Sequence, residues 1–274
     1  MRRTLRHTSK RSPLVFGLLA VLLVAALSVP AGAAQGTTVI RAGEAALSSP
    51  ASGAAQERLL AAGTQYATPY YDNDSGVPGP VVIVVGGMHG NEPAGYMAAR
   101  RLAGVRPQKG RLIVIPEANK LAIEAKTRTG SHPGDLNRAF PTSRSDKPGS
   151  PLAASIWSLV ERVRPDYLFD LHEGYDFHKI NKDSVGQSII YYPVQGASEM
   201  AKAMQTAVNR GISNSKHHYS VLRYPVKGSL ARAAGQLLGA RAMILETSRK
   251  QPLETRVDQH VTMVKAALAR IGML

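Results

Sequence analysis

Short apolar runs and segments with helical periodicity alternate along most of this chain. The apolar runs predict buried strands at residues 81–85, 111–116, 166–172, 187–193 and 240–247, and an edge strand containing Pro69 within residues 64–74. Helices are predicted at residues 92–104, 150–163, 198–211 and 228–239, followed by a last helix with one apolar face from Val257 to Ile271. This alternation predicts an α/β fold with a mixed, largely parallel sheet covered by helices on both faces.

The N-terminal segment differs from the rest of the chain. Five Lys or Arg residues lie among the first 11 positions, and an apolar run from Leu14 to Val29 follows them. Together with the small residues after Val29, this pattern predicts a secretory signal peptide over residues 1–34 and a secreted or cell-envelope location. An uncleaved membrane anchor is the alternative. Residues 35–62 are rich in Ala, Gly and Ser and predict a linker or pro-segment, which leaves residues 63–274 as the main folded domain.

Composition narrows the classes of partner. The chain has 34 Lys and Arg against 19 Asp and Glu, and it stays basic after the first five cations are removed. A basic surface suits an anionic cell wall or an acidic substrate, although simple solvation also explains it. Aromatic residues make up only 5% and no recognition motif is present, so nucleic acid is not an expected partner. The absence of cysteine excludes disulfides, iron–sulfur clusters and thiolate zinc sites.

Ionisable side chains stand where three of the predicted strands end. His89 and Glu92 follow the strand at 81–85, His172 ends the strand at 166–172, and Glu246 lies near the end of the strand at 240–247. In open α/β sheets, ligands bind beyond the carboxyl ends of the strands, so these four groups can meet in one crevice. Two imidazoles and a carboxylate form a catalytic zinc set, and a second carboxylate can accept a proton from water.

Two further features of the sequence lie near this set. The glycines around His89 do not form the G-x-G-x-x-G pattern of a nucleotide site, and no P-loop lysine is present. The loop "KTRTGSHPGDLNRAFP" (126–141) carries Arg128, Asn137 and Arg138, whose donors can clamp a carboxylate or stabilise an oxyanion. A solvated loop of the same composition is the alternative.

Four segments in this order resemble the zinc carboxypeptidase superfamily, most closely its succinylglutamate desuccinylase/aspartoacylase family. They are "GGMHGNEPAG" (86–95), "GDLNRAFP" (134–141), "FDLHEG" (169–174) and "ILETS" (244–248). The resemblance implies one Zn²⁺ per chain, held by His89, Glu92 and His172. It implies that Glu246 is the general base and that Arg128 polarises the scissile carbonyl. It further implies that Asn137 and Arg138 bind a substrate carboxylate.

Together with the predicted signal peptide, the resemblance predicts an exported zinc-dependent hydrolase that cleaves an amide bond by metal-activated water. The expected substrate is a peptide or cell-wall peptide with a free carboxylate. The export signal favours it, as does the fact that only 28 residues follow Glu246, where the aspartoacylase-type enzymes carry a β-rich domain. An N-acyl amino acid deacylase and a non-catalytic wall-binding protein are the alternatives. Tyr224 is a candidate for the mobile active-site tyrosine of the peptidase branch.

Overall fold

The computed structural model describes residues 55–131 and 134–274. These residues belong to one structural unit, Ser49–Leu274. The predicted signal peptide lies outside the described residues, as does the predicted linker up to residue 54. Within the described part of the chain, no helix combines the length and hydrophobicity that a membrane span requires.

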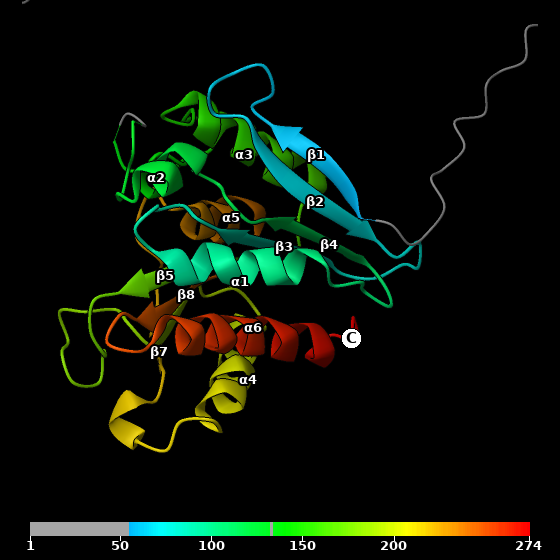
Figure 1. The fold of residues 1–274 in the computed structure, drawn as a ribbon. Coiled ribbons are helices and arrows are strands. Elements are labelled where there is room, and N and C mark those ends of the chain that lie inside the picture. Colours follow the sequence, from blue (N-terminus) through cyan, green and yellow to red (C-terminus); the bar gives the residue numbers. More distant parts are fainter. Residues whose placement is uncertain (1–54, 132–133) are drawn as a thin grey trace, which may run out of the picture. The chain divides into compact units, whose positions relative to one another are not determined.

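The eight strands of the described residues form one mixed sheet (Figure 1). Their order across the sheet is β1-β2-β4-β3-β5-β8-β6-β7. The central strands β4, β3, β5 and β8 are parallel, whereas β1, β2 and β6 pair in antiparallel fashion with β2, β4 and β8. The predicted fold class is confirmed. The bounds are β1 Gln56–Leu60, β2 Thr68–Asp74, β3 Val81–Gly86, β4 Arg111–Ile115, β5 Tyr167–Gly174, β6 Ser188–Tyr191, β7 Ser220–Arg223 and β8 Arg241–Ser248.

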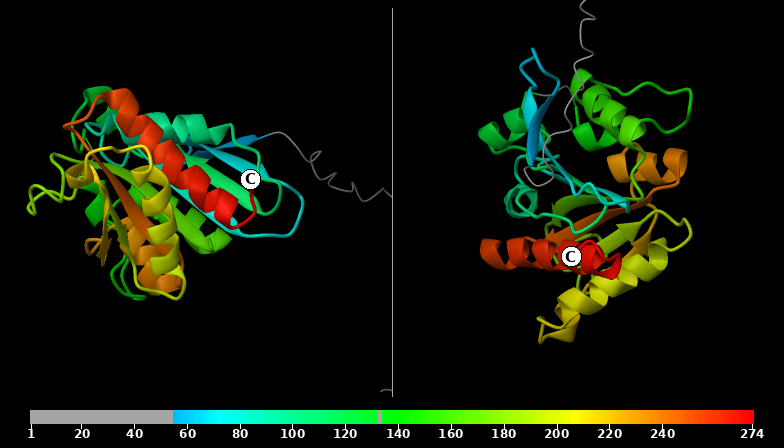
Figure 2. Two further views of the ribbon diagram at one scale, coloured as in Figure 1. Left: turned by 90° about the horizontal axis from the view of Figure 1, so that it is seen from below. Right: turned by 90° about the vertical axis from the view of Figure 1, so that its right-hand side faces the viewer.

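Helices cover both faces of this sheet (Figure 2). Along β3, Val82 and Val84 pack into a core shared with α1, α4 and α6, while Ile83 and Val85 pack into a second core with α3 and α5. This alternation follows from the two-residue period of a strand. The helices are α1 Pro93–Ala103, α2 Lys120–Ala125, α3 Pro151–Val163, α4 Ala197–Asn209, α5 Leu230–Leu238 and α6 Leu253–Arg270, with 3₁₀ turns η1 Leu136–Arg138 and η2 Ser215–His217.

One edge of the sheet differs from the prediction. The strand predicted at the edge, β2, has β1 as its outer neighbour, and β1 lies inside the stretch predicted as linker. In β1 only Leu60 is buried, so the segment lacks the apolar pattern that announces a strand. Pro69 is tolerated in β2 because the pairing with β4 begins at Tyr71, beyond the proline.

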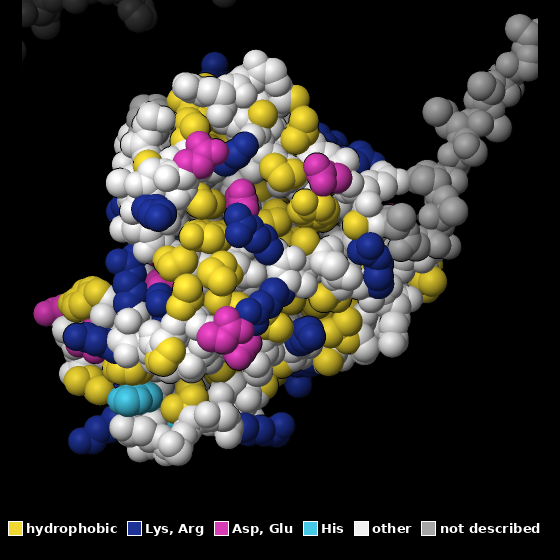
Figure 3. All heavy atoms as spheres, viewed as in Figure 1, with side chains coloured by type: hydrophobic (Ala, Val, Ile, Leu, Met, Phe, Trp, Pro, Cys, Tyr) yellow, Lys and Arg dark blue, Asp and Glu magenta, His cyan; other side chains and the backbone are white. Residues whose placement is uncertain are grey.

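Charged side chains are spread over the surface in the view of Figure 3. Lysine and arginine side chains alternate there with acidic and apolar ones and form no single basic patch on that face. The Lys and Arg side chains on this side of the molecule are therefore dispersed.

Candidate active site and metal centre

The polar residues predicted at the strand ends meet at the carboxyl ends of β3, β5 and β8. These strands are direct neighbours, and the chain continues from β3 to β4 on one side while β5 lies on the other. Such a switch point is where open α/β sheets bind ligands. His172 and Glu246 lie opposite each other in the register of β5 and β8, and His89 and Glu92 lie in the loop between β3 and α1.

Two glycines let the backbone around this loop pack closely. A Cβ on Gly90 would lie 1.8 Å from the carbonyl oxygen of Ala122 in α2, and one on Gly95 would lie 2.5 Å from the carbonyl oxygen of Leu171 in β5. Only glycine fits such backbone-to-backbone contacts. The loop that carries His89 and Glu92 is thus clamped between α2 and β5.

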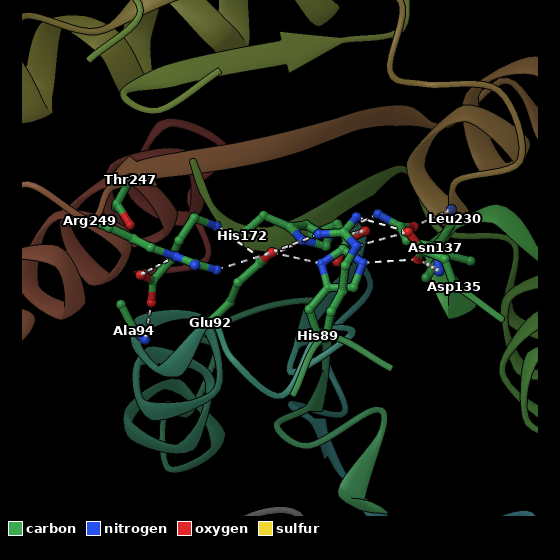
Figure 4. Close-up of polar contacts among 12 residues, drawn as sticks. His89, Glu92, Ala94, Asp135, Asn137, His172, Leu230, Thr247 and Arg249 are labelled. Atoms are coloured by element: carbon green, nitrogen blue, oxygen red, sulfur yellow. Dashed lines mark hydrogen bonds and ion pairs between the residues drawn. The ribbon is translucent and has the colours of Figure 1, made fainter. Parts of the chain in front are cut away.

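Three buried side chains form a cluster of metal-ligand type (Figure 4). His89 Nδ1 lies 2.8 Å from Glu92 Oε1, and His172 Nδ1 lies 2.8 Å from Glu92 Oε2. One ligand atom from each residue lies within 4.8 Å of the others, and all three side chains are buried. Two nitrogens and a carboxylate facing a common point match a catalytic zinc site with one open position.

The outer contact of His89 shows that this cluster fits a cation. His89 Nε2 lies 2.9 Å from Asp135 Oδ1, and burial, which raises the pKa of Asp135, is outweighed by His89 and Arg128, which hold it well below its usual range. Ionised carboxylates only accept hydrogen bonds, and a neutral imidazole has a single N–H to donate, so His89 cannot donate to both Asp135 and Glu92. A metal ion held at Nδ1 would resolve this conflict, because the proton would then remain on Nε2 for Asp135.

The far side of the His172 ring contacts two polar groups, a carboxylate and an amide nitrogen. Its Nε2 lies 3.1 Å from Asp170 Oδ2, although not in hydrogen-bond alignment, and 3.0 Å from Asn137 Nδ2. Burial lowers the pKa of His172, but the carboxylates of Asp170 and Glu92 outweigh it and raise that pKa well above its ordinary value. The surplus negative charge around this ring attracts a cation.

Asn137 belongs to this supporting arrangement. Its Oδ1 accepts a hydrogen bond from the backbone N–H of Leu230 at 3.1 Å, and its Nδ2 faces His172. Both ends of the buried amide are engaged within the protein. Its grip on a substrate carboxylate stays a prediction.

Glu246 lies beside the cluster without a partner of its own. The carboxyl group is buried, and its Oε2 has no hydrogen-bond partner among the described residues. Burial raises the pKa of Glu246 to about 8; Glu92 and Asp170 add to the effect, while His172 and Arg128 oppose it. A carboxyl group that titrates near neutral pH suits proton transfer in either direction.

The two predicted arginines reach the same cleft from the loop after α2. Arg128 donates from Nη2 and Nε to Asp135 Oδ2, at 2.8 and 3.1 Å, and its Nη1 lies 3.4 Å from Glu92 Oε1. Arg138 is exposed, and its Nη1 donates to the carbonyl oxygen of Asn137 at 2.8 Å. Arg138 therefore keeps donors for a ligand. The structure brings every predicted site residue together, and their individual roles stay predictions.

The cleft has a volume of about 500 Å³. Tyr224 is not among its lining residues; the ring packs against the Arg232 guanidinium, 5.2 Å from the ring centroid. In this structure Tyr224 lies outside the site. The lining residues are His89, Asn91, Glu92, Arg128, Asn137, Arg138, His172, Glu173, Gly174, Tyr175, Val185, Ile190, Val226, Ile244, Glu246 and Arg249.

Three contributors to the site were not predicted as such. Asp135 had a signal, since it is an acid two residues before Asn137 in a loop rich in donors. Glu173 accepts a hydrogen bond from the backbone N–H of Ala94 at 2.5 Å. Arg249 directly follows β8 and lines the cleft. The last two depend on how α1 packs against β5 and on how β5 pairs with β8, which no local pattern reveals.

Comparison with known proteins assigns this chain to a family. Residues 78–271 match the succinylglutamate desuccinylase/aspartoacylase catalytic domain. The chain belongs to the succinylglutamate desuccinylase/aspartoacylase family. The predicted resemblance is confirmed, and the match spans every residue of the cleft.

Relatives of this family member differ from it in length. Over 103 residues the chain is 35% identical to N-alpha-acetyl-L-2,4-diaminobutyric acid deacetylase of Halomonas elongata. The matched segment covers 35% of this chain and 29% of that protein. Cell shape determinant protein Csd4 of Helicobacter pylori (Gln46His variant) has the same fold, with a TM-score of 0.64 and 21% identity over 75% of this chain and 55% of Csd4. A structure from Shewanella amazonensis SB2B also has a TM-score of 0.64, at 16% identity, over 80% of this chain and 88% of that one. The chain thus spans about a third of the curated relative and about half of Csd4.

Proposed function

We propose that this protein is an exported zinc-dependent hydrolase that cleaves an amide bond in a peptide or cell-wall peptide with a free carboxylate. One observation supports it most. The two Nδ1 atoms of His89 and His172 face Glu92 within 4.8 Å in a cleft that also contains the buried Glu246 and the exposed Arg138. This combination provides a metal site, a proton acceptor and an anion-binding group around one space.

His89, Glu92 and His172 would hold the zinc ion. When bound, the ion supplies Lewis acidity and lowers the pKa of water. Asp135 keeps the His89 proton on Nε2, and Asn137 and Asp170 fix the far side of the His172 ring. These contacts keep both Nδ1 atoms directed inward.

Glu246 and the arginines carry the remaining steps. Glu246 takes a proton from the attacking water at a carboxylate oxygen and returns it to the leaving amine nitrogen. Arg128 places its Nη1 donor beside Glu92, where it can stabilise negative charge that forms on the carbonyl oxygen. Arg138 offers its exposed guanidinium to the free carboxylate of the substrate, and a bidentate pair would orient the amide.

The names of related proteins are consistent with amide hydrolysis. Csd4 is described as a D,L-carboxypeptidase, in a structure with bound mDAP. The Halomonas relative is described as a deacetylase of an acetylated amino acid. This second name favours an alternative substrate, an N-acyl amino acid, which shares the amide bond and the free carboxylate.

The location is part of the proposal. The basic, then apolar N-terminal segment supports export, and the excess of Lys and Arg supports association with an anionic cell wall. A non-catalytic wall-binding protein is less well supported, because it would not need Glu246 buried and unpartnered beside three metal ligands.

A substrate panel tests this function. Zinc-loaded protein is incubated with peptides, muropeptides and N-acyl amino acids, and release of free amine is measured. We expect hydrolysis of at least one class, lost on chelation and lowered at least ~10²-fold in Glu246→Gln. Glu161→Gln, on the exposed surface of α3, is the matched control and should retain activity. Absence of zinc-dependent hydrolysis across all three classes would refute the proposal.

A further inference from the structure

Glu173 directly follows the metal ligand His172 in β5, but its carboxylate has different neighbours. Successive residues of a strand point to opposite faces of the sheet. His172 faces Glu92 in the cleft, whereas the Glu173 carboxylate contacts α1 and α6. The Glu173 side chain is fully buried. A buried carboxylate is costly unless it is paired and hydrogen-bonded, so Glu173 needs strong partners, and these two helices supply them.

The first partner of Glu173 is the N-terminus of α1. Glu92 is the N-cap of this helix, yet in the part of the chain that the structure describes its side chain makes no capping hydrogen bond. Its two oxygens face the two histidines instead. Pro93 has no N–H, so Ala94 carries the first N–H group of the helix. Glu173 Oε1 accepts a hydrogen bond from this N–H at 2.5 Å. Glu173 therefore caps α1 from a neighbouring strand, in place of Glu92.

A second bond links Glu173 to Glu92 itself. The backbone N–H of Glu173 donates to Glu92 Oε2 at 3.1 Å, and the same oxygen lies 2.8 Å from His172 Nδ1. Figure 4 shows Ala94 beside Glu92, at the end of the cluster away from Asp135. The side chain of Glu173 thus holds the backbone just after Glu92, while its N–H holds the Glu92 carboxylate. Both bonds restrict how Glu92 can turn.

Two arginines hold the Glu173 carboxylate in turn. Arg256 of α6 donates from Nη1 to Glu173 Oε2, and its side chain is only 12% exposed. Arg249, just after β8, forms longer ion pairs, from Nε to Glu173 Oε2 at 3.9 Å and from Nη2 to Glu92 Oε1 at 3.8 Å. Removing one partner of a buried pair leaves an uncompensated charge behind. Through Arg256, the metal ligand Glu92 is connected to α6, a helix whose described residues do not line the cleft.

We propose that Glu173 is a positioning residue for the metal centre, which holds Glu92 in the orientation of a metal ligand, and that Arg256 keeps Glu173 in place. This inference rests on the proposed function and adds two residues that act through Glu92. Outer contacts of this kind orient a ligand before the ion binds, so their loss weakens metal affinity. The two histidines already have such contacts, and Glu173 gives Glu92 a matching one.

The zinc affinity of the folded protein tests the proposal, in competition with a chelator of known affinity. Glu173→Ala should weaken zinc binding by about 10- to 100-fold, the usual effect of losing an outer contact of a metal ligand. Glu173→Gln keeps an oxygen that can accept from Ala94 and should recover part of this loss. Arg256→Gln should also weaken zinc binding. Its loss and that of Glu173→Gln should not add in the double variant, since both remove the same ion pair.

A matched control separates positioning from general stability. Asp72 in β2 and Arg111 in β4 form another partly buried ion pair, with Arg111 Nε donating to Asp72 Oδ1 at 2.7 Å, and neither residue lines the cleft. Arg111→Gln should destabilise the protein but leave the zinc affinity of its folded form unchanged. The visible absorption spectrum of Co²⁺-loaded protein is a second readout, because it reports the geometry of the metal ligands. It should change in Glu173→Ala and stay the same in Arg111→Gln.

The same measurements contain the results that would overturn the proposal. One is an unchanged zinc affinity and Co²⁺ spectrum in Glu173→Ala, and the other is an equal loss of zinc affinity in Arg111→Gln. Should Glu173→Ala not fold, the comparison of Arg256→Gln with Arg111→Gln decides in the same way. With a parent protein that binds zinc, these results would leave the proposed function intact. A parent protein that binds no zinc would overturn both.

Discussion

Replacing Glu246 by glutamine should stabilise the metal-free protein, increasingly so as pH rises. Burial raises the pKa of this carboxyl group to about 8 from its ordinary value of 4.5. The folded protein therefore favours the protonated form. Its stabilising contribution is fully present below pH ~4.5 and is lost as pH rises toward 8. Each pH unit between the two values corresponds to ~1.4 kcal/mol, which sets a ceiling of about 5 kcal/mol.

Urea unfolding of chelated protein measures this effect. Trp157, the single tryptophan, lies in α3 and is buried in the core that α3 shares with α5, so its fluorescence reports unfolding. The free energy of unfolding of Glu246→Gln minus that of the parent should grow by several kcal/mol between about pH 5 and about pH 8.5. Glu161→Gln controls for the loss of one carboxyl group from the exposed surface. A difference that stays constant over this pH range would refute the assignment of Glu246 as a buried, protonated acid.

Three further predictions concern the residues around the metal ligands. Asp135→Asn should weaken zinc affinity by about 10- to 100-fold in a chelator competition, since it replaces the charged acceptor that orients His89 by a neutral amide. Gly90→Ala should destabilise the protein by about 3 kcal/mol in thermal unfolding, because its Cβ would overlap the Ala122 backbone. Arg138→Ala and amidation of the substrate carboxylate should each lower kcat/KM, and in a double-mutant cycle their losses should not add.

Sequence patterns predicted the fold because each central strand is buried on both faces. A strand buried on both faces needs a continuous apolar run such as residues 81–85, and β3 forms where this run predicts a strand. The strand β1 has four exposed or half-exposed residues and carries no such signal. Its pairing with β2 depends on the tertiary structure, so the sequence alone placed it in a linker.

The candidate site was predictable for a related reason. The four side chains lie near or just beyond the carboxyl ends of buried strands, and parallel strands bring these ends together. They are His89, Glu92, His172 and Glu246. What could not be predicted is which contacts each side chain makes within the protein. The amide of Asn137 lines the cleft and also lies between His172 and the backbone of Leu230, and its role toward a substrate stays a prediction.

Zinc stoichiometry tests the central claim most directly. Purified protein should contain about one zinc per chain by elemental analysis, as expected for three protein ligands. His89→Ala should lose the ion, because two remaining ligands do not retain it. His217→Ala should keep it, since this ring stacks on Phe177 at 3.9 Å and does not line the cleft. Full zinc occupancy in His89→Ala, or loss of zinc in His217→Ala alone, would contradict the proposed metal centre.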